Sequence, residues 1–350
     1  MSIFSPKRLK AVAVDIGTSS VKVLELDRRG SSYRVGQFAI ERLPRNAVVE
    51  RGITDVEAVS GAVRQAIKRS KCKRKPAIVA IASSHVVSRT VQLPVGLREA
   101  EIEEQVMIEA SQHIPHPLEE VNLDYQVVDS SETDGSYLVK ITACRKEIIE
   151  GYSLVIESAG LEAAVVDVDS FAVERGFAFV TAGMSDALRG KVIALIDFGE
   201  VTTRLDIFVD DVAIYDRDHS FGGRILTENI RTRYGISFEE AEAAKLSGDL
   251  PENYREDLLE PFKATMAREA SRAVEFFVSA GRGYESVDML FITGGCTRIE
   301  GIAEVVQMHT GLPTAVASPF SPSGIKASAI LQRQSPLLLK ACGLAVRGAG

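Results

Sequence analysis

The stretch AVAVDIGTSSVKVLEL, residues 11–26, decides the fold. Its first six residues have the apolar pattern of a buried strand, and VKVLEL has the pattern of a second strand. The GTSS between them predicts a tight turn, because glycine and small hydroxyl residues favour turns. The stretch VIALIDFGEVTTRLDIFV, residues 192–209, shows the same succession of strand, turn and strand. We therefore expect the chain to contain one hairpin design twice.

The two hairpins also match residue by residue. The matched positions are an acid, a glycine, a hydroxyl residue and a base: Asp15 and Asp197, Gly17 and Gly199, Ser20 and Thr202, Lys22 and Arg204. The two copies are 182 residues apart in the chain. Internal similarity of this kind predicts two domains built on one plan.

Helix and strand patterns alternate along both halves of the chain. Apolar residues recur at helical spacing in residues 55–70, and AIVAIA from residue 77 has the pattern of a buried strand. The elements predicted in the second half are helices at 225–234, 238–246 and 254–281 and a strand at 289–295 that runs into a glycine turn. Strands that alternate with helices predict an α/β fold.

An additional segment, residues 85–162, interrupts the first half. Its pattern is strand, helix, strand, strand, helix, and Pro115 and Pro117 end its first helix. The expected division of the chain is a first domain of residues 1–84 and 163–190 to which residues 337–350 return, an inserted subdomain of residues 85–162, and a second domain of residues 191–336. Specificity is expected to lie in the inserted subdomain, because the fold alone says little about function.

The composition is that of a globular protein and excludes several functions. Apolar residues make up 45% and charged residues 25% of the chain, and 41 basic and 48 acidic residues give a net charge of −7. No basic stripe with interleaved aromatic residues occurs, so nucleic acid is not an expected partner. No apolar run reaches the ~20 residues of a membrane-spanning helix, and residues 1–10 lack the apolar core of a signal peptide. The four cysteines have no metal-binding spacing, which predicts reduced thiols in a cytoplasmic protein.

The two hairpin turns have the residues of a phosphate-binding site. Phosphate needs backbone N–H groups directed at it, and glycine lets the backbone approach closely. The candidate phosphate-binding residues are Gly17, Thr18, Ser19, Ser20 and Lys22 in the first copy and Gly199, Thr202 and Thr203 in the second. Asp15 and Asp197 end their strands, and we expect them to hold Mg²⁺ through its water ligands. The alternative is a pair of ordinary hairpins, but their recurrence in one register favours the phosphate site.

Two glycine pairs have the features expected beside a nucleoside. Gly294 and Gly295 end a strand before a helix and leave room for a flat ring, on which Arg298 is placed to stack. Gly222 and Gly223 also open a helix. We therefore expect these residues to contact a cofactor.

An acid and a base on one helix complete the candidate cofactor site. Glu242 and Lys245 are three residues apart and share one helix face. Glu242 is placed to accept hydrogen bonds from ribose hydroxyls, and the Lys245 stem to lie along the base. The alternative is a surface salt bridge with no ligand.

At this point the chain resembles a known superfamily. The segments AVAVDIGTSSVKVLEL, ALIDFGEVTTRLDIF, LFITGGCTRI and LKACGLAV resemble the phosphate-1, phosphate-2, adenosine and connect-2 segments of the actin/Hsp70/sugar-kinase fold. The segment VVDVDSFA, residues 165–172, looks like connect-1. The resemblance implies a two-domain, actin-like α/β fold with an inserted subdomain of the type found in FtsA and PilM.

The inserted subdomain distinguishes the families within this fold. Residues 99–128, EAEIEEQVMIEASQHIPHPLEEVNLDYQVV, closely resemble the PilM family of type IV pilus assembly proteins. FtsA usually ends in an amphipathic anchor helix, and the chain is expected to lack one because it stops at residue 350, just past connect-2. The alternatives are an FtsA-like cytoskeletal or division protein and a small-molecule kinase of the same superfamily.

The resemblance implies that the chain binds ATP or ADP with Mg²⁺ in a cleft between the domains. Asp169 occupies the connect-1 position, where relatives that hydrolyse ATP well carry Glu or Gln, so it is the candidate catalytic residue of at most a weak ATPase. Glu200 follows Gly199 where the family usually has a small residue. An acidic side chain beside phosphates opposes their binding unless it turns away or meets the metal.

The resemblance also implies partners. PilM-like proteins bind the cytoplasmic N-terminal peptide of a PilN-like inner-membrane protein, and they link the pilus assembly platform to its motor ATPases, which drive twitching motility. The chain is thus expected to lie at the inner face of the inner membrane through its partners, with possible self-association. In the helix at 98–113, Ile102, Val106 and Ala110 form an inward stripe, whereas Met107 and Ile108 lie off it and are the candidate partner-binding residues. The alternative is a helix buried on a wider face.

Overall fold

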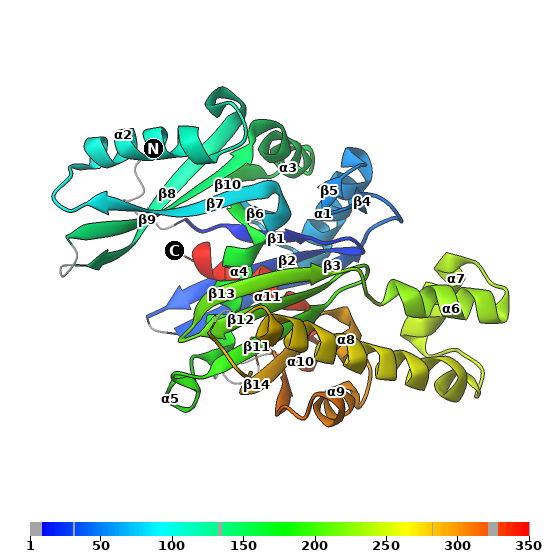
Figure 1. Cartoon of the computed structure of the whole chain (residues 1–350). Helices are drawn as coiled ribbons and strands as arrows, with labels where there is room; N and C mark the ends of the chain where they lie inside the picture. The colour runs from blue at the N-terminus through cyan, green and yellow to red at the C-terminus, as the bar shows by residue number, and fades with distance from the viewer. Residues whose placement is uncertain (1–8, 31, 132–134, 282, 321–327, 350) are drawn as a thin grey trace. The chain divides into compact units, whose positions relative to one another are not determined.

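The computed structural model describes residues 9–30, 32–131, 135–281, 283–320 and 328–349 (Figure 1). The chain forms two compact units, residues 1–23 and 38–172 in the first and residues 24–37 and 173–350 in the second. Among the described residues, no helix combines the length and the apolar character needed to cross a bilayer. The expectations for the extreme N-terminus and for Gly350 concern residues 1–8 and 350, which lie outside the described ones.

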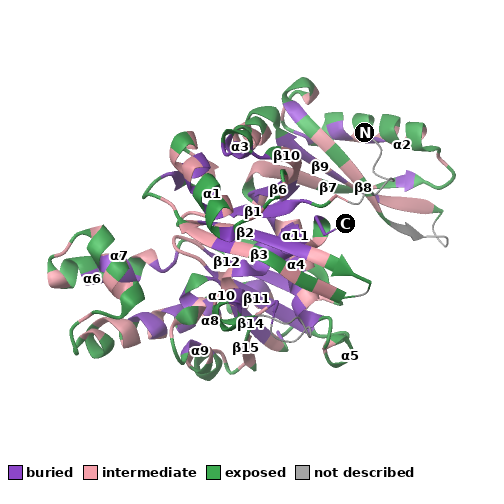
Figure 2. Cartoon of the chain, turned by 180° about the vertical axis from the view of Figure 1, so that it is seen from behind, coloured by how far each residue is buried: buried purple, intermediate pink, exposed green. Residues whose placement is uncertain are grey.

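The first sheet has the strand order β10-β6-β1-β2-β3. Its strands are β1 (Val12–Ile16), β2 (Ser20–Arg29), β3 (Ser32–Arg42), β6 (Pro76–Ile81) and β10 (Glu162–Val168). Strand β6 pairs in parallel with β1 and with the edge strand β10. Strand β1 is buried throughout and β6 at every residue after Pro76 (Figure 2), which explains their nearly continuous apolar sequences.

Two helices bury their apolar faces in the core of the first unit. Helix α1 (Val56–Ser70) begins where the Asp55 carboxylate accepts the N–H of Ala58, and it ends at Lys71 in a left-handed conformation. Helix α3 (Lys146–Ser158) packs beside it in the same apolar cluster. A short hairpin, β4 (Val48–Val49) and β5 (Gly52–Ile53), precedes α1.

The inserted segment forms a small antiparallel sheet covered by one helix. Strands β7 (Val86–Pro94), β9 (Ser136–Arg145) and β8 (Val121–Ser131) lie in that order, and helix α2 (Glu99–His113) runs along one face of them (Figure 1). Val106 and Ala110 of α2 are buried against Val139 and Ile141 of β9. Helix α3, by contrast, buries Tyr152, Val155 and Ile156 in the cluster that contains α1.

The second sheet has the strand order β13-β12-β11-β14-β15. Its strands are β11 (Val192–Phe198), β12 (Thr203–Val209), β13 (Val212–His219), β14 (Met289–Thr293) and β15 (Thr314–Val316). Read from its other edge, this order is β15-β14-β11-β12-β13. It matches the first sheet, β10-β6-β1-β2-β3, strand for strand in chain order. The repeat that the sequence shows in one hairpin thus extends over a whole sheet.

The second unit also contains the helices α4 (Asp169–Thr181), which starts in the first unit, α5 (Ser185–Leu188), α6 (Arg224–Tyr234), α7 (Phe238–Ser247), α8 (Glu260–Ser279), α9 (Ile302–Thr310), α10 (Ala329–Gln334) and α11 (Leu339–Arg347). One apolar cluster contains residues of α6, α8 and α9, and another contains residues of α4 and α11. The helix predicted from residue 254 begins with a π-helical turn, Arg255–Leu259, before α8.

Helices α4 and α11 approach each other closely at Gly176. A Cβ atom added there would overlap the carbonyl oxygen of Leu339. Nearby, Arg175 Nε donates a hydrogen bond to the Gly343 carbonyl oxygen at 3.1 Å. Only glycine lets the two backbones come this close.

Gly176→Ala is expected to destabilise the protein by about 2 kcal/mol or more, because the added methyl group forces the two helices apart. The matched control is Gly151→Ala in α3, where an added Cβ meets nothing within 4 Å. The control is expected to be neutral or to stabilise by up to about 1 kcal/mol, since alanine favours helix more than glycine does. Chemical denaturation of the two variants measures both effects, and equal stability of the two would contradict the close approach.

Candidate functional site

The two repeated turns are closed by the same backbone hydrogen bond. The Gly17 N–H donates to the Ser20 carbonyl oxygen at 3.0 Å, and the Gly199 N–H donates to the Thr202 carbonyl oxygen at 3.0 Å. A Cβ on Gly199 would lie 2.7 Å from that Thr202 oxygen, so the second turn requires glycine. Both glycine amides, which the sequence predicts to face phosphate, are therefore used inside their own turns.

In the first unit, two buried carboxylates, Asp15 and Asp169, each pair with a basic side chain. We call Asp15, Lys22, Arg51, Ser83 and Asp169 the Asp15 cluster. Asp15 is 4% exposed, and its Oδ2 lies 3.1 Å from Lys22 Nζ. Lys22 is thus held next to the turn by the carboxylate that the sequence assigns to the metal.

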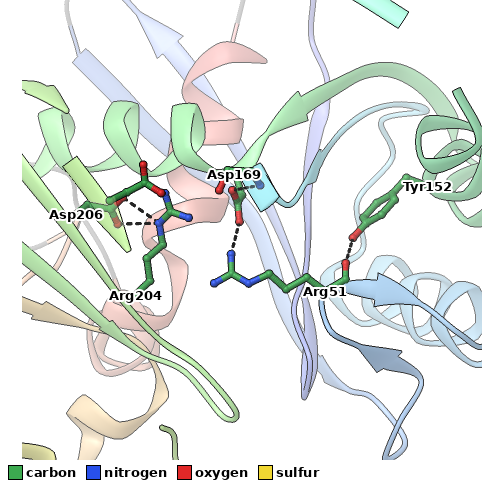
Figure 3. A network of polar contacts seen from close by, with 7 residues as sticks. Arg51, Tyr152, Asp169, Arg204 and Asp206 are labelled. Carbon is green, nitrogen blue, oxygen red and sulfur yellow. Dashed lines mark hydrogen bonds and ion pairs between the residues drawn. The ribbon is translucent and has the colours of Figure 1, made fainter. Parts of the chain in front are cut away.

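Asp169 is held on both of its carboxylate oxygens. The Ser83 N–H donates to Oδ1 at 2.8 Å, and Arg51 Nη1 lies 3.2 Å from Oδ2 (Figure 3). The Tyr152 hydroxyl donates in turn to the carbonyl oxygen of Arg51 at 2.9 Å. Burial raises the pKa of Tyr152, and the charges of Asp169 and Asp15 raise it further, so both carboxylates lie near this phenol.

The sequence did not identify three members of this arrangement, Arg51, Ser83 and Tyr152. They are 118, 86 and 17 residues from Asp169, and none belongs to a recognised motif. Glu50 and Arg51 have φ angles of 48° and 63°, a backbone conformation that no local pattern in the sequence predicts.

In the second unit, the candidate cofactor residues gather around Cys296. We call Asp197, Gly199, Gly223, Glu242, Lys245 and Cys296 the Gly199 cluster. Cys296 Sγ lies 3.6 Å from the Gly199 carbonyl oxygen, and a Cβ on Gly223 would lie 3.0 Å from Sγ. Burial raises the pKa of Cys296 to about 12, while the charge of Lys245 lowers it and those of Asp197 and Glu242 raise it. Segments far apart in the sequence therefore meet at a thiol that sequence analysis treated only as reduced.

Glu242 and Lys245 form more than a surface salt bridge. Their charged groups lie 2.6 Å apart, with side chains 25% and 18% exposed. The fully buried Thr227 hydroxyl donates to Glu242 Oε2 and accepts from Lys245 Nζ, both at 2.6 Å. The pair on α7 is thereby fixed to α6.

Glu200 is turned towards a basic partner. Its Oε1 accepts from Arg224 Nε at 3.2 Å and Nη2 at 3.1 Å, and its Oε2 is buried without a hydrogen-bond partner among the described residues. The N–H groups of Gly223 and Arg224 donate to the carbonyl oxygens of Gly199 and Glu200. The acidic side chain is therefore neutralised, and the start of α6 is joined to the second turn by backbone hydrogen bonds.

Some candidate residues have structural contacts instead. The buried Thr203 hydroxyl donates to the Phe221 carbonyl oxygen at 2.9 Å. Arg204, which matches Lys22 in the repeat, is buried and pairs with Asp206 at 2.9 Å (Figure 3) and with Asp216 at 2.9 Å. The two copies thus share a backbone turn but not the use of the basic residue.

In the two glycine pairs, some positions are tightly packed and Gly295 is open. Gly294 has a φ of 91°, and a Cβ there would overlap Asp197 Oδ1. Gly222 is confined in the same way by the backbone of Glu200. Gly295 is exposed and a Cβ there meets nothing within 4 Å, and Arg298 is also exposed. The surface that the sequence assigns to a flat ring is thus open at Gly295.

On the inserted subdomain, α2 presents the two faces that its sequence predicts. Val106 and Ala110 are each 1% exposed, whereas Met107 and Ile108 are 47% and 45% exposed. A shallow groove that the sequence did not reveal lies beside α2 and β7. Its lining residues are Val87, Arg89, Val91, Glu109, Ala110, His113, Ile114 and Ile141.

Thr227→Val is expected to lower the free energy of unfolding by about 1–3 kcal/mol, because it removes the two hydrogen bonds that the buried Thr227 hydroxyl makes with the charged groups of Glu242 and Lys245. Thr227→Ser keeps the hydroxyl and is the matched control, expected to retain most of the stability. Urea denaturation measures the difference. Equal stability of the valine and serine variants would show that the hydroxyl contributes nothing.

Comparison with known proteins identifies the family. The family of type IV pilus assembly protein PilM matches residues 13–349. The solved structure of a PilM-PilN type IV pilus biogenesis complex is similar with a TM-score of 0.78 and 24% identity, over 98% of this chain and 99% of that one. The ethanolamine utilization protein EutJ from Carboxydothermus hydrogenoformans is similar with a TM-score of 0.55 and 16% identity, over 97% of this chain and 90% of that one.

Curated relatives include cell division proteins. FtsA of Pseudomonas aeruginosa is 22% identical over 90% of this chain and 84% of its own length. FtsA of Bacillus subtilis is 23% identical over 67% of this chain, which spans only 57% of that protein. The actin-like fold and the relation to FtsA expected from the sequence are confirmed, and the chain belongs to the PilM family of type IV pilus assembly proteins.

Proposed function

We propose that the chain is a nucleotide-binding adaptor of the type IV pilus assembly platform. The observation that carries the proposal is the Gly199 cluster, in which the buried Cys296 thiol lies 3.6 Å from the carbonyl oxygen of the repeated glycine turn and the charges of Asp197, Glu242 and Lys245 act on it. The Asp15 cluster supplies the matching turn, with a carboxylate and a lysine beside it. An adaptor of this kind acts by adopting different conformations with different nucleotides and passing the difference to a partner.

The residues present fit a nucleotide with a divalent cation. Thr18 and Ser19 of the first turn and Thr202 of the second are placed beside the closed glycine turns, where hydroxyl and N–H groups suit phosphate oxygens. Gly295 leaves open space for a base, and Glu242 offers carboxylate oxygens to ribose hydroxyls. Bound Mg²⁺ would neutralise phosphate charge, and a carboxylate at the end of a strand, such as Asp15 in the first unit or Asp197 in the second, is of the kind that holds its water ligands.

Turnover of the nucleotide is expected to be slow. Asp169, the candidate for orienting water, already accepts hydrogen bonds from Ser83 and Arg51 on its two oxygens. A carboxylate engaged in this way is a poor general base. We therefore propose that nucleotide identity sets a conformation and that hydrolysis is at most weak.

Asp15→Asn and Gly295→Val are expected to weaken binding of Mg²⁺–ATP and Mg²⁺–ADP at least about tenfold, the first by removing a charge and the second by filling the open space beside the base. Gly61→Ala in α1, where a Cβ meets nothing within 4 Å, is the control for glycine replacement. Isothermal titration calorimetry measures the affinities. Unchanged affinity in both variants would show that the nucleotide does not bind at Asp15 and Gly295 and would refute the proposed site.

The inserted subdomain is the proposed attachment point for the membrane partner. We propose that it receives the cytoplasmic N-terminal peptide of a PilN-like inner-membrane protein, which would hold the chain at the inner face of that membrane and connect the platform to motor ATPases. The solved PilM-PilN complex supports a partner of this kind. In this chain, β7 is an edge strand, and its alternate residues Val87, Arg89 and Val91 line the groove. An extended peptide can pair with such an edge and place side chains in the groove.

Replacement of Met107 and Ile108 together by Glu is expected to weaken peptide binding at least about tenfold, because two exposed apolar side chains of the inserted subdomain become charged. The probe is a synthetic peptide of the first residues of the PilN-like protein encoded with this chain, expected to bind the unaltered protein at micromolar affinity or better. Met308→Glu, on α9 of the other unit and 80% exposed, is the matched control. Absence of binding to the unaltered protein would refute the peptide proposal.

A further inference from the structure

Both chain connections of the inserted subdomain lead to one carboxylate. The chain enters the subdomain through the turn Ser83–His85, and the Ser83 N–H donates to Asp169 Oδ1 at 2.8 Å. The chain leaves it through α3, and the Tyr152 hydroxyl of α3 donates to the Arg51 carbonyl oxygen at 2.9 Å. Arg51 Nη1 in turn lies 3.2 Å from Asp169 Oδ2 (Figure 3). One carboxylate oxygen of Asp169 therefore accepts from the segment that enters the inserted subdomain. The other contacts Arg51, which is held by the helix that leaves it.

Arg51 occupies a backbone conformation that needs external support. Glu50 and Arg51 have φ angles of 48° and 63°, a region that residues other than glycine rarely adopt. Such conformations persist where the surroundings fix them, and they concentrate at functional sites. The Tyr152 hydrogen bond to the Arg51 carbonyl oxygen supplies support of this kind, from a phenol that is only 4% exposed.

The side chains of the pair are shielded from water. The Asp169 side chain is 6% exposed and the Arg51 side chain 18% exposed. At this depth a missing cation would leave a carboxylate almost without solvent, which is strongly unfavourable. A second contact links the inserted subdomain to α4, the helix that begins at Asp169. Lys140 of β9 lies over the ring of Phe171, 4.4 Å from its centre. Phe171 is two residues from Asp169 at the start of α4.

We propose that Arg51 is a positioning residue of the nucleotide site and that Tyr152 holds it in place. Arg51 sets the orientation of the Asp169 carboxylate together with the Ser83 N–H, and the helix that leaves the inserted subdomain sets Arg51. A change in the inserted subdomain thereby reaches Asp169 through two hydrogen bonds and one ion pair. The inference rests on the proposed nucleotide-binding function, but it makes a statement about the protein without nucleotide that can be tested alone.

The first test is hydrogen exchange of the nucleotide-free protein, followed by mass spectrometry on peptides that contain residues 82–86. Arg51→Gln and Tyr152→Phe are expected to raise exchange at the Ser83 amide severalfold, because an Asp169 carboxylate whose contact with Arg51 is lost or loosened no longer holds this N–H in a fixed geometry. The matched control is Arg69→Gln, which breaks an ion pair of α1 with Glu41 and leaves the Asp15 cluster intact. Exchange in Arg51→Gln that equals the control would overturn the proposal.

The second test separates positioning from a purely structural role by a double-mutant cycle on Mg²⁺–ATP affinity. Arg51→Gln and Asp169→Asn are each expected to weaken binding about tenfold, and the double variant to be no weaker than the weaker of the two, because Arg51 acts through Asp169. Effects that multiply would overturn the proposal, since they would show independent roles. If the unaltered protein binds no nucleotide, the proposed function falls, while the exchange experiment still decides whether Arg51 positions Asp169.

Discussion

The register of the central hairpin in each sheet is the constraint on which the rest of the structure depends. Strands β1 and β11 are buried and pair with a parallel strand on one side, so their only freedom is in the turn that follows. The hydrogen bonds from Gly17 and Gly199 across four residues fix that turn. A shift of one residue would exchange the two faces of the next strand and turn its apolar residues outward. The hydrogen bond that closes each turn thus fixes the register of the strand that follows, and with it which side chains face the core.

Local periodicity in the sequence predicted only part of this structure. The hairpins, the helices of the inserted segment and the exposed position of Met107 and Ile108 follow from local periodicity, and the structure agrees with them. Arg51 and Cys296 were not recognised, because their partners are about 100 residues away in the chain. Contacts of this kind are decided by topology, which no local pattern records.

The matched bases show a subtler failure of local pattern. Lys22 and Arg204 occupy equivalent positions after equivalent turns, yet Lys22 pairs with Asp15 and Arg204 with Asp206 and Asp216. Asp206 follows on the same strand face and Asp216 lies on β13, so the neighbours decide the partner. Asp15 beside the first turn is paired with Lys22, and Glu200 beside the second with Arg224. A polyanion approaching either of these two carboxylates therefore meets a paired charge, which lowers the electrostatic repulsion that an isolated one would exert.

Cys296 has a consequence for the chemistry that the protein tolerates. Oxidation, alkylation and exchange with disulfides all begin from the thiolate, and a buried thiol whose pKa is about 12 is almost entirely protonated at neutral pH. Burial beside Gly199 and Gly223 therefore disfavours the thiolate form of this sulfur, on which its oxidation and disulfide exchange depend. The Cys296 sulfur thus packs between Gly199 and Gly223, and its burial lowers the reactivity that an exposed cysteine would have at this position.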